Sequence, residues 1–518
     1  MLLTTSPQPL TLGKILRSVE LTRPLAPELA KLQISGIEFD SRRIVPGRVF
    51  FAIRGGRHDG SLYIDEAIAR GAAAVVTEDT DTRELSIPVV RVTDTRRALA
   101  HAAAENQGNP SNDLFCVGVT GTNGKTSITW ILTEAFRRLT SGAAHLGTLG
   151  YGITAPDGFK GEAALTTTPD PLVLQCILAV ARAAGSVAAV LEVTSQGIAQ
   201  HRTAAIEWDV AIFTNLTRDH LDLHGSMEEY ARLKESLFTD ALARSRKEKR
   251  TAIINADDAL GRKLLSALRG SKISCISYSV SDPQADAVVC KASGDTVHSA
   301  LHCRIRGMEL HLHTQLIGSF NIQNVLAAAS ALVAYGFTAN EIESAIAQVP
   351  HVPGRLQLVS SSSRKIFIDY AHTPDGLVQA QQSLRPLTPG RLITVFGCGG
   401  DRDRGKRSLM GAVVAELSDI CIITSDNPRT EDPESIIADI LPGAEGARRI
   451  GNETRAGTEI RVIPDRRQAL AEAIAAAGTD DVVLVAGKGH ETYQEIGTVR
   501  HPFSDYEICR ELLDRLPK

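Results

Sequence analysis

The sequence predicts an α/β protein of three domains. At about 150 residues per domain, its 518 residues allow three or four folding units. Short apolar runs typical of buried strands alternate with helical stretches, which favours mainly parallel sheets covered by helices on both faces. Breaker-rich segments at residues 108–113 and 349–355 mark two boundaries. We therefore expect domains at residues 1–112, 113–350 and 351–518.

The composition argues against several classes of protein. Hydrophobic residues make up 43% of the chain and charged residues 22%, which is ordinary for a globular protein and argues against wholesale disorder. The formal net charge of −4 gives no global signal for nucleic acid or an anionic membrane. We see neither an apolar run near the ~20 residues of a membrane helix nor a signal-peptide pattern. We therefore expect a cytoplasmic protein with no membrane insertion and no nucleic-acid partner. We also expect a monomer.

The cysteines point to reduced thiols. None of the eight cysteines forms a pair at C-x-x-C spacing, and several lie in apolar runs. Buried reduced thiols are the expected state of such residues in a cytosolic protein. The spacing gives a zinc site little support.

The three predicted domains differ in their elements. Residues 1–112 mix short strands with turns and form a small α/β domain, in which residues 63–78 read as helix, glycine stop and strand. The second and third domains each contain apolar strands separated by helices, and the third resembles a dinucleotide-binding (Rossmann-like) sheet. The predicted strands are residues 114–120, 187–193, 210–215 and 251–257 in the second domain, and 365–370, 391–397, 420–425 and 482–487 in the third.

A glycine-rich loop joins the first central strand to a helix. Gly121 and Gly124 let backbone N–H groups approach phosphate oxygens, and the helix N-terminus adds a positive dipole. Lys125 is placed to reach the β- and γ-phosphates, and the hydroxyl of Thr126 suits Mg²⁺. Val119 stands where the common G-x₄-G-K-[ST] motif has its first glycine. The pattern predicts a phosphate-binding loop on a P-loop ATPase-type parallel sheet.

Polar residues follow two neighbouring strands of that sheet. Glu192 ends one strand, and Asp219 with His220 follows another. Open α/β sheets bind ligands at the carboxyl edge, and a carboxylate there suits Mg²⁺. Taken alone, His220 is more often a structural histidine than a ligand.

A lysine lies on the apolar face of a nearby helix. Ser226 and Glu229 form a capping box that predicts the helix start, and Lys234 shares a face with Tyr230 and Phe238. The ordinary interpretation is an apolar stem with a hydrated head. The alternative is a desolvated amine, which as a neutral group reacts with CO₂ and becomes a carbamate able to support Mg²⁺.

Ten motifs occur in register along the chain: TGTNGKT, LTTTPDP, LEVTSQG, NLTRDHLDLHGSMEEYARLK, GSFNIQN, VPGRLQ, DYAHTPDGL, FGCGGDRDRGKR, DNPRTEDP and AGKGHETYQ. Together they resemble the Mur ligases, and within them the enzymes that add the third amino acid. The resemblance spans roughly residues 36–505 and implies ATP-dependent synthesis of a peptidoglycan precursor, with roles in cell-wall biogenesis, cell shape and cell division. It also favours the carbamate on Lys234.

The resemblance implies roles for three groups of residues. Gly56-Arg57 replaces the usual His-Gln of the uridine site, and Gln196 replaces a commoner His. The implied ATP site comprises Thr120, Gly121, Thr122, Asn123, Gly124, Lys125, Thr126, Asn324, Arg355 and Asp369, with His372 beside it. The implied UDP-muramoyl-dipeptide site comprises Phe39, Ser41, His58, Thr166, Thr167, Thr168, Thr194, Gln200 and Arg202. The implied diaminopimelate site comprises Arg402, Asp426, Asn427, Pro428, Arg429, Gly487 and Glu491.

The implied reaction is formation of an amide with meso-2,6-diaminopimelate. The γ-carboxylate of D-Glu in UDP-N-acetylmuramoyl-L-Ala-D-Glu attacks the γ-phosphate of ATP and forms an acyl phosphate. The amine of diaminopimelate then attacks the acyl phosphate, and phosphate leaves. Lys125, Glu192, His220 and carbamylated Lys234 are the expected catalytic group, and Thr126, Glu192, His220 and Lys234 the expected Mg²⁺ ligands. Arg429 fits the distal carboxylate of diaminopimelate and Glu491 its ammonium.

Part of this pattern admits other interpretations. A folylpolyglutamate synthase-like ligase would not require Arg429, and a P-loop ATPase switch or motor protein would hydrolyse nucleotide without forming an amide. A catalytically inactive scaffold would retain the fold alone. Arg404, Lys406 and Arg407 are expected in a solvated, charge-rich loop.

Overall fold

The computed structural model describes residues 10–55, 59–78, 85–217, 226–359, 364–450 and 457–515. The chain forms two compact units. One unit consists of residues 1–286 and 327–338, and the other of residues 287–326 and 339–518.

The first unit begins with a four-stranded parallel sheet in the order β3-β4-β5-β6. Apolar clusters cover both of its faces, and α4 packs on one face and α3 on the other. The predicted small α/β domain is therefore confirmed. Its elements are β1 Leu10–Thr11, α1 Leu12–Ile15, α2 Pro27–Ala30, β2 Gln33–Ile34, β3 Gly36–Glu38, β4 Arg48–Ala52, α3 Ile64–Ala69, β5 Ala74–Thr77, β6 Val89–Arg91 and α4 Thr95–Asn106.

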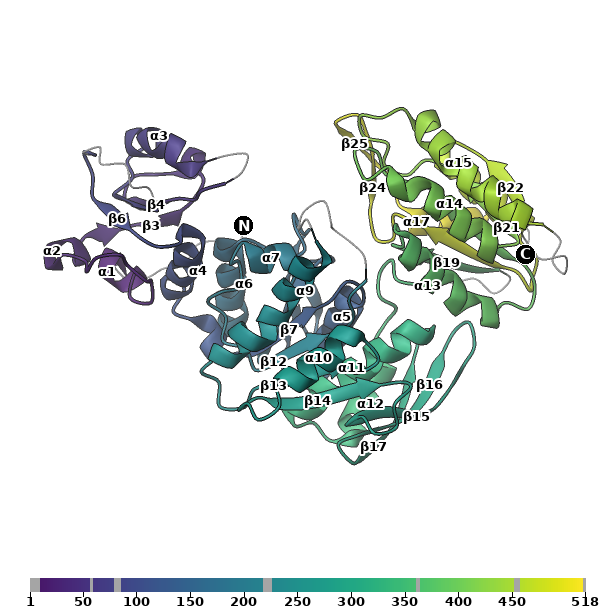
Figure 1. Cartoon of the computed structure of the whole chain (residues 1–518), viewed down its shortest axis with the longest axis horizontal. Coiled ribbons are helices and arrows are strands. Elements are labelled where there is room, and N and C mark those ends of the chain that lie inside the picture. Colours follow the sequence, from purple (N-terminus) through teal and green to yellow (C-terminus); the bar gives the residue numbers. More distant parts are fainter. Residues whose placement is uncertain are drawn as a thin grey trace. The chain divides into compact units, whose positions relative to one another are not determined.

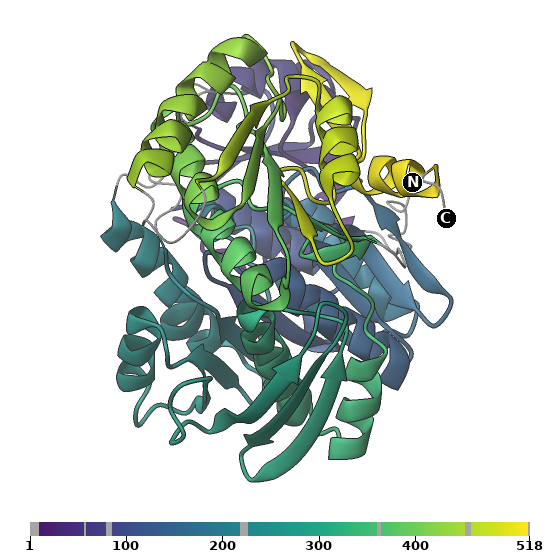
Figure 2. The ribbon, with the colours of Figure 1, turned by 90° about the vertical axis from the view of Figure 1, so that its right-hand side faces the viewer.

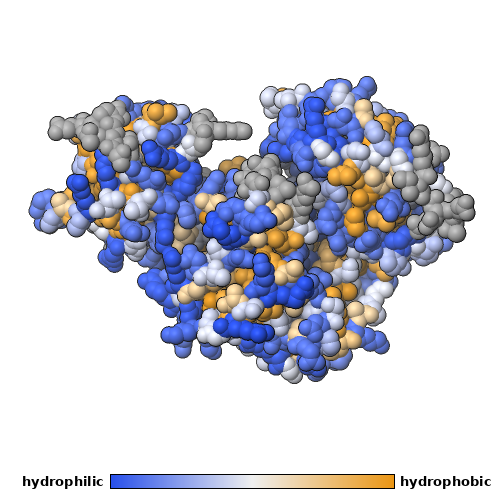
Figure 3. Space-filling view, in the orientation of Figure 1, coloured by the Kyte–Doolittle hydropathy of each residue, from blue (hydrophilic) through white to orange (hydrophobic). Residues whose placement is uncertain are grey.

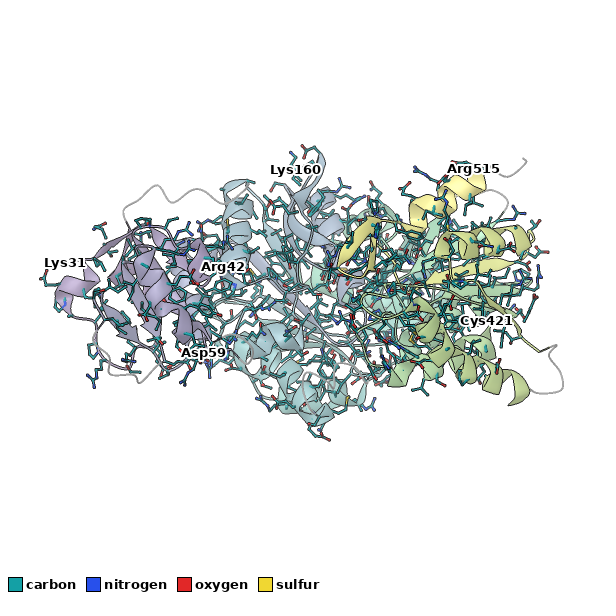
Figure 4. The ribbon with its side chains drawn as sticks, turned by 90° about the horizontal axis from the view of Figure 1, so that it is seen from above. Lys31, Arg42, Asp59, Lys160, Cys421 and Arg515 are labelled. Carbon is teal, nitrogen blue, oxygen red and sulfur yellow. The ribbon has the colours of Figure 1, made fainter. Side chains whose placement is uncertain are left out.

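A larger sheet follows in the same unit, with the strand order β10-β9-β8-β11-β7-β12-β13-β14. The strands from β8 to β13 run parallel, whereas β9 and β10 form an antiparallel hairpin at the edge. Lys160 on β10 lies at the outer side of this hairpin (Figure 4). The elements are β7 Phe115–Thr120, α5 Lys125–Leu139, β8 Ala143–Gly147, β9 Gly150–Ala155, β10 Gly158–Glu162, α6 Pro171–Ala183, β11 Ala188–Glu192, α7 Ser195–Ala199, β12 Val210–Phe213, α9 Met227–Ser236, the π-helix η4 Leu237–Leu242, β13 Thr251–Asn255, α10 Ala259–Ala267 and β14 Ser274–Ser279.

The four predicted central strands are confirmed as β7, β11, β12 and β13. Nearly all of their side chains are buried, as expected of parallel strands that helices cover on both faces. Trp208 is fully buried in the core beside β7, and a Cβ at Gly118 would lie 2.9 Å from its ring. The core therefore requires a residue without a side chain at that point of the strand.

The second unit begins with three antiparallel strands in the order β15-β16-β17. Helix α12 packs against β17. Helix α11 starts in this unit with residues 319–326. The elements are β15 Ala287–Gly294, β16 Ser299–Ile305, β17 Met308–Thr314, α11 Ser319–Tyr335 and α12 Ala339–Ala347.

The remainder of this unit is a six-stranded sheet in the order β18-β19-β23-β20-β21-β22. Only β18 is antiparallel to its neighbour. Helices α13, α14 and α15 cover one face, where α14 and α15 lie side by side (Figure 1), and α16 and α17 cover the other. The elements are β18 Gln357–Val359, β19 Lys365–Asp369, α13 Pro374–Leu384, β20 Leu392–Phe396, α14 Gly405–Leu417, β21 Ile420–Ile423, α15 Pro433–Ile450, β22 Glu459–Val462, α16 Arg466–Ala476, β23 Val482–Ala486, β24 Tyr493–Ile496, β25 Val499–Pro502 and α17 Asp505–Asp514.

These sheets confirm the predicted α/β class and its N-terminal, central and C-terminal sheets (Figure 2). The four strands predicted in the third domain are β19, β20, β21 and β23. Cys421 lies within β21 (Figure 4), and burial raises the pKa of its thiol to about 12. The boundaries at residues 112 and 350 stay predictions.

The surface is largely polar. Hydrophilic residues cover most of the face drawn in Figure 3, as expected when the apolar side chains lie between helices and sheets. Among the described residues, none of the helices combines the length and the apolar character that a membrane span requires.

Candidate active site

The loop after β7 is held at the carboxyl edge of the central sheet. Gly121 has a φ of 146°, and a Cβ there would lie 1.8 Å from the hydroxyl oxygen of Thr214. Gly124 has a φ of 86°, which a residue with a Cβ rarely adopts. Thr214, which follows β12, donates a hydrogen bond to the carbonyl of Asn123 at 2.6 Å. Both glycines are therefore required by the geometry of the loop.

Lys125 is the first residue of α5, and its side chain folds over the loop. Its Nζ donates to the carbonyl oxygens of Gly121 at 2.9 Å and Thr122 at 2.7 Å. The ammonium group thus lies beside the helix N-terminus, where phosphate oxygens bind in loops of this type. The role of Lys125 in binding phosphate stays a prediction.

Glu192 lies next to this loop at the end of β11. Its carboxylate accepts hydrogen bonds from Thr126 Oγ1 at 3.0 Å and from the backbone and hydroxyl of Thr148 at 2.7 and 3.2 Å. Glu192 is 1% exposed, and a Cβ at Gly147 would lie 2.3 Å from its Oε1. The fold thus brings together the predicted metal ligands Thr126 and Glu192. Thr148 was not predicted, although its place directly after a strand at the same edge was a usable signal.

Lys234 reaches the same loop from α9, which begins after the N-cap Ser226, as predicted. Lys234 is 1% exposed, and its Nζ donates to the carbonyl of Gly121 at 2.8 Å. The ring of Tyr230 lies 4.3 Å from Nζ, and its hydroxyl is 3.3 Å from Thr122 Oγ1. The amine is therefore buried against an aromatic face, as the alternative interpretation requires. Asp219 and His220 lie outside the described residues.

A row of threonines extends from Glu192 towards α7. Thr168 donates to the carbonyl of Glu192 at 2.8 Å and lies 3.0 Å from the hydroxyl of Thr194. The guanidinium of Arg202 donates to Thr166 at 3.1 Å and to Gln200 at 3.0 Å. Burial lowers the pKa of Arg202. These residues and Thr167, whose hydroxyl lies 3.3 Å from that of Thr148, form one hydrogen-bonded network.

The predicted uridine contacts are only partly described. Ser41, 6% exposed, donates to Glu66 at 2.7 Å, and this hydrogen bond is the main reason that the pKa of Glu66 is lowered. Phe39 packs against the apolar core of the N-terminal sheet. His58, with Gly56 and Arg57, lies outside the described residues.

In the second unit, the predicted nucleotide contacts Arg355, Asp369 and His372 surround Tyr370. The guanidinium of Arg355 lies 4.6 Å from the Tyr370 ring. The ring of His372 also lies 4.6 Å from it. Asp369 accepts backbone hydrogen bonds at 2.7 and 2.8 Å, and desolvation raises its pKa. Asn324, 5% exposed, donates to Asn321 at 3.1 Å.

The DNPR loop follows β21 and packs against the loop after β23. Asp426 is 8% exposed, and a Cβ at Gly487 would lie 2.4 Å from its Oδ2. Asn427 donates to Glu491 at 2.8 Å and accepts from Lys488 at 2.9 Å. Lys488 is fully buried and lies 3.0 Å from Glu491. Lys488 was missed, although a lysine in a glycine-rich loop after a buried strand was visible in the sequence.

Arg429 lies at the open side of this loop. Its Nη1 donates to the carbonyl of Gly400 at 2.7 Å, and its Nε lies 3.4 Å from Glu495. Arg429 and the exposed Arg402 both lie near Gly399. A Cβ at Gly399 would be 2.9 Å from Nη1 of Arg429 and 3.7 Å from Cγ of Arg402. Arg429 thus lies in the same loop as Asp426 and Asn427, and Asn427 contacts Glu491 of the loop after β23.

The prediction of a solvated charge-rich loop is wrong for Arg407. It lies on α14 with 1% of its side chain exposed, and it pairs with Glu431 at 2.8 Å and Asp439 at 2.9 Å. A guanidinium that gains two carboxylate partners can be buried where an unpaired one cannot. Arg404 is 70% exposed, as predicted, and Lys406 donates to the carbonyl of His372 at 2.9 Å.

Comparisons with known proteins match most of the chain. Family models described as "Mur ligase family, catalytic domain", "Mur ligase middle domain" and "Mur ligase, glutamate ligase domain" match residues 33–107, 119–332 and 354–489. The UDP-N-acetylmuramoyl-L-alanyl-D-glutamate–2,6-diaminopimelate ligase of Pseudomonas aeruginosa is 42% identical over 93% of this chain and 95% of its own.

Solved structures of ligases are also similar to this chain. A UDP-N-acetylmuramoyl-L-alanyl-D-glutamate–2,6-diaminopimelate ligase structure has a TM-score of 0.69 and 31% identity, and covers 98% of this chain and 99% of its own. A folylpolyglutamate synthase of Mycobacterium tuberculosis has a TM-score of 0.61 over 82% of this chain and 96% of its own. Its 18% identity shows a common fold only.

Proposed function

Because the chain belongs to the Mur ligase family, we propose that it is an ATP-dependent ligase of peptidoglycan precursor synthesis. It joins meso-2,6-diaminopimelate to the D-Glu γ-carboxylate of UDP-N-acetylmuramoyl-L-Ala-D-Glu. The observation that carries the proposal is the similarity, over almost the entire chain, to a ligase of that substrate class. The buried polar contacts at the edge of the central sheet support it.

The first step activates the carboxylate. A carboxylate is a poor electrophile, and transfer of the γ-phosphoryl group of ATP converts it into an acyl phosphate. The backbone N–H groups around Gly121 and Gly124 cradle the phosphates, and Lys125 exchanges its two carbonyl contacts for phosphate oxygens. These fixed donors stabilise charge that develops in the transition state without reorganisation during the reaction.

The residues present fit Mg²⁺. Glu192 is a buried carboxylate beside the hydroxyl of Thr126, and oxygen ligands of this kind are those that Mg²⁺ prefers. Thr126 and Glu192 would hold one ion, and His220 with Lys234 would support a second. When bound, Mg²⁺ neutralises charge on the transferring phosphoryl group.

The burial of Lys234 suits a carbamate on its side chain. Its amine is buried beside Tyr230, and burial favours the neutral form of an amine, which is the form that reacts with CO₂. As N6-carboxylysine it would supply a negative group next to the phosphate loop. The unmodified lysine would supply no such negative group.

The remaining residues position the two substrates. Thr166, Thr168 and Arg202 belong to the hydrogen-bonded network that leads to Glu192, and would orient the muramoyl-dipeptide. Arg429 would clamp the distal carboxylate of diaminopimelate through its planar guanidinium. Glu491 would pair with the distal ammonium, with Lys488 and Asn427 fixing its carboxylate.

The decisive experiment supplies ATP and UDP-N-acetylmuramoyl-L-Ala-D-Glu with either meso-diaminopimelate or lysine and measures phosphate release. We expect release with diaminopimelate and little with lysine. A preference for lysine would overturn the specificity. Release that does not depend on the UDP-dipeptide would favour the ATPase switch, and turnover of a folate with glutamate would favour the folylpolyglutamate synthase.

A variant tests the carbamate. We expect Lys234→Ala to abolish amide formation without rescue by bicarbonate, because no amine remains to be carboxylated. Lys263→Ala, which removes an exposed lysine of α10, is the matched control and should keep full activity. A fully active Lys234→Ala variant would exclude a catalytic role for this lysine.

A further inference from the structure

Three potential metal ligands meet on the exposed face of the antiparallel β15-β16-β17 sheet. They are Cys290, His302 and Glu309, one from each strand, and their ligand atoms all lie within 4.8 Å of one another. This sheet belongs to the second unit. None of the three residues takes part in the proposed ligase reaction.

A β-bulge brings Cys290 to this position. Val289 pairs with Cys303 and Lys291 with His302, so that Cys290 is the extra residue between them. A bulge leaves one residue outside the ladder and redirects its side chain. Val289 and Cys303 lie towards the covered face, whereas Cys290 is exposed near His302. Within the described chain Cys290 is also the one exposed thiol.

The other two ligands are already in contact. His302 Nε2 lies 2.8 Å from Glu309 Oε2, with 39% and 52% of the side chains exposed. The ring of His302 also stacks on the ring of His311, with the centroids 4.6 Å apart and the planes at 5°. The stacking restricts the imidazole plane, so that less freedom remains to be lost on ligand binding.

We propose that Cys290, His302 and Glu309 bind a zinc ion. A thiolate, an imidazole and a carboxylate are the ligand types of protein zinc sites. Tetrahedral coordination at Zn–S of about 2.3 Å and Zn–N/O of about 2.0–2.1 Å places the ligand atoms about 3.3–3.6 Å apart. The three ligand atoms now lie within 4.8 Å of one another, and rotation of these side chains on the exposed face brings them to the separations that zinc requires. Water completes the coordination.

Zinc binding replaces a thiol proton and the His302–Glu309 hydrogen bond with bonds to the metal. The Cys290 thiol loses its proton to solvent as the Zn–S bond forms. The proton shared by His302 Nε2 and Glu309 is also released to solvent, while Nδ1 of the neutral imidazole carries the remaining N–H, so that Nε2 and the carboxylate are free to bind the metal. The site differs in chemistry from the oxygen ligands around Glu192 and Thr126. Excess Mg²⁺ is therefore not expected to compete for it.

The test uses Co²⁺ as a spectroscopic substitute for Zn²⁺, added to the full chain in saturating Mg²⁺. We expect one equivalent of Co²⁺ to give a near-ultraviolet thiolate-to-cobalt charge-transfer band, which Zn²⁺ then abolishes by displacement. Zn²⁺ should also protect Cys290 from alkylation. A missing band, or unchanged alkylation with Zn²⁺, would overturn the proposal.

Variants assign the ligands. Cys290→Ser should lose the band, and His302→Gln should weaken Co²⁺ binding at least tenfold. Cys275→Ser, which removes a half-buried thiol of β14, is the matched control and should keep both. A band that survives in Cys290→Ser would refute the site. Equal near-ultraviolet circular dichroism of all variants without metal excludes misfolding as the cause.

Discussion

Replacement of Arg429 by alanine tests the proposed amino-acid site most directly. Arg429 is 21% exposed at the edge of the DNPR loop and already interacts with Glu495. Its φ is 51°, and because alanine also carries a Cβ, the variant keeps the same backbone cost. The change therefore removes the guanidinium with little alteration of the loop's backbone preference.

The size of the effect follows from the contacts. Hydrogen bonds to charged groups contribute about 1.5–3 kcal/mol. Since Arg429 exchanges Glu495 for the ligand carboxylate rather than gaining a first partner, the lower half of this range applies. A loss of about 1.5–2 kcal/mol corresponds to a ~10–30-fold rise in KM for meso-diaminopimelate.

Steady-state phosphate release, with each substrate varied in turn, measures this rise. KM for ATP and for the UDP-dipeptide should change less than about twofold, since Arg429 contacts neither in the proposed mechanism. Arg404→Ala, which removes an exposed arginine paired with Glu431, is the control and should leave all three constants nearly unchanged. Equal increases for ATP and diaminopimelate would refute the clamp.

Three further predictions concern the loop, stability and pH. Gly121→Ala should lower phosphate release at least ~10²-fold, because its Cβ would lie 1.8 Å from Thr214 Oγ1; unchanged turnover would contradict this. Arg466→Met should cost about 3–5 kcal/mol in urea unfolding, because it leaves the fully buried carboxylate of Asp505 without its 2.7 Å partner; substituting Asp505→Leu as well should restore most of the loss. Burial lowers the pKa of His145 to about 4. Between pH 6.5 and 4 the unfolded chain therefore binds more protons than the folded chain, and the free energy of unfolding decreases as the pH is lowered. From pH 7.5 to 5 this amounts to about 2 kcal/mol, and an equally steep pH dependence in His145→Gln would contradict it.

Local chain signals predicted much of the active site. The strand, glycine loop and helix around Lys125 are consecutive in the sequence, and each part has its own signature. Glu192 was predictable because it ends an apolar strand, and the carboxyl ends of parallel strands share one edge. The buried face of α9 that carries Lys234 followed from helical spacing alone.

Other features were beyond such reasoning. Arg407 looked solvated because its neighbours in the chain are charged and polar, whereas its partners Glu431 and Asp439 come from elsewhere in the sequence. Lys488 likewise gains its role only by meeting Asn427. Cys290 gave no metal signal, because the proposed ligands come from three strands and the thiol reaches them through a bulge.

The sequence by itself determined the α/β class, the main strands and the glycine-rich loop after β7, because apolar periodicity and glycine placement act over neighbouring residues. Only the tertiary structure decided which polar groups face one another at Glu192, at Asn427 and on the β15-β16-β17 sheet. Those encounters depend on strand order and register, which bring together residues distant in the chain and which local propensities do not specify.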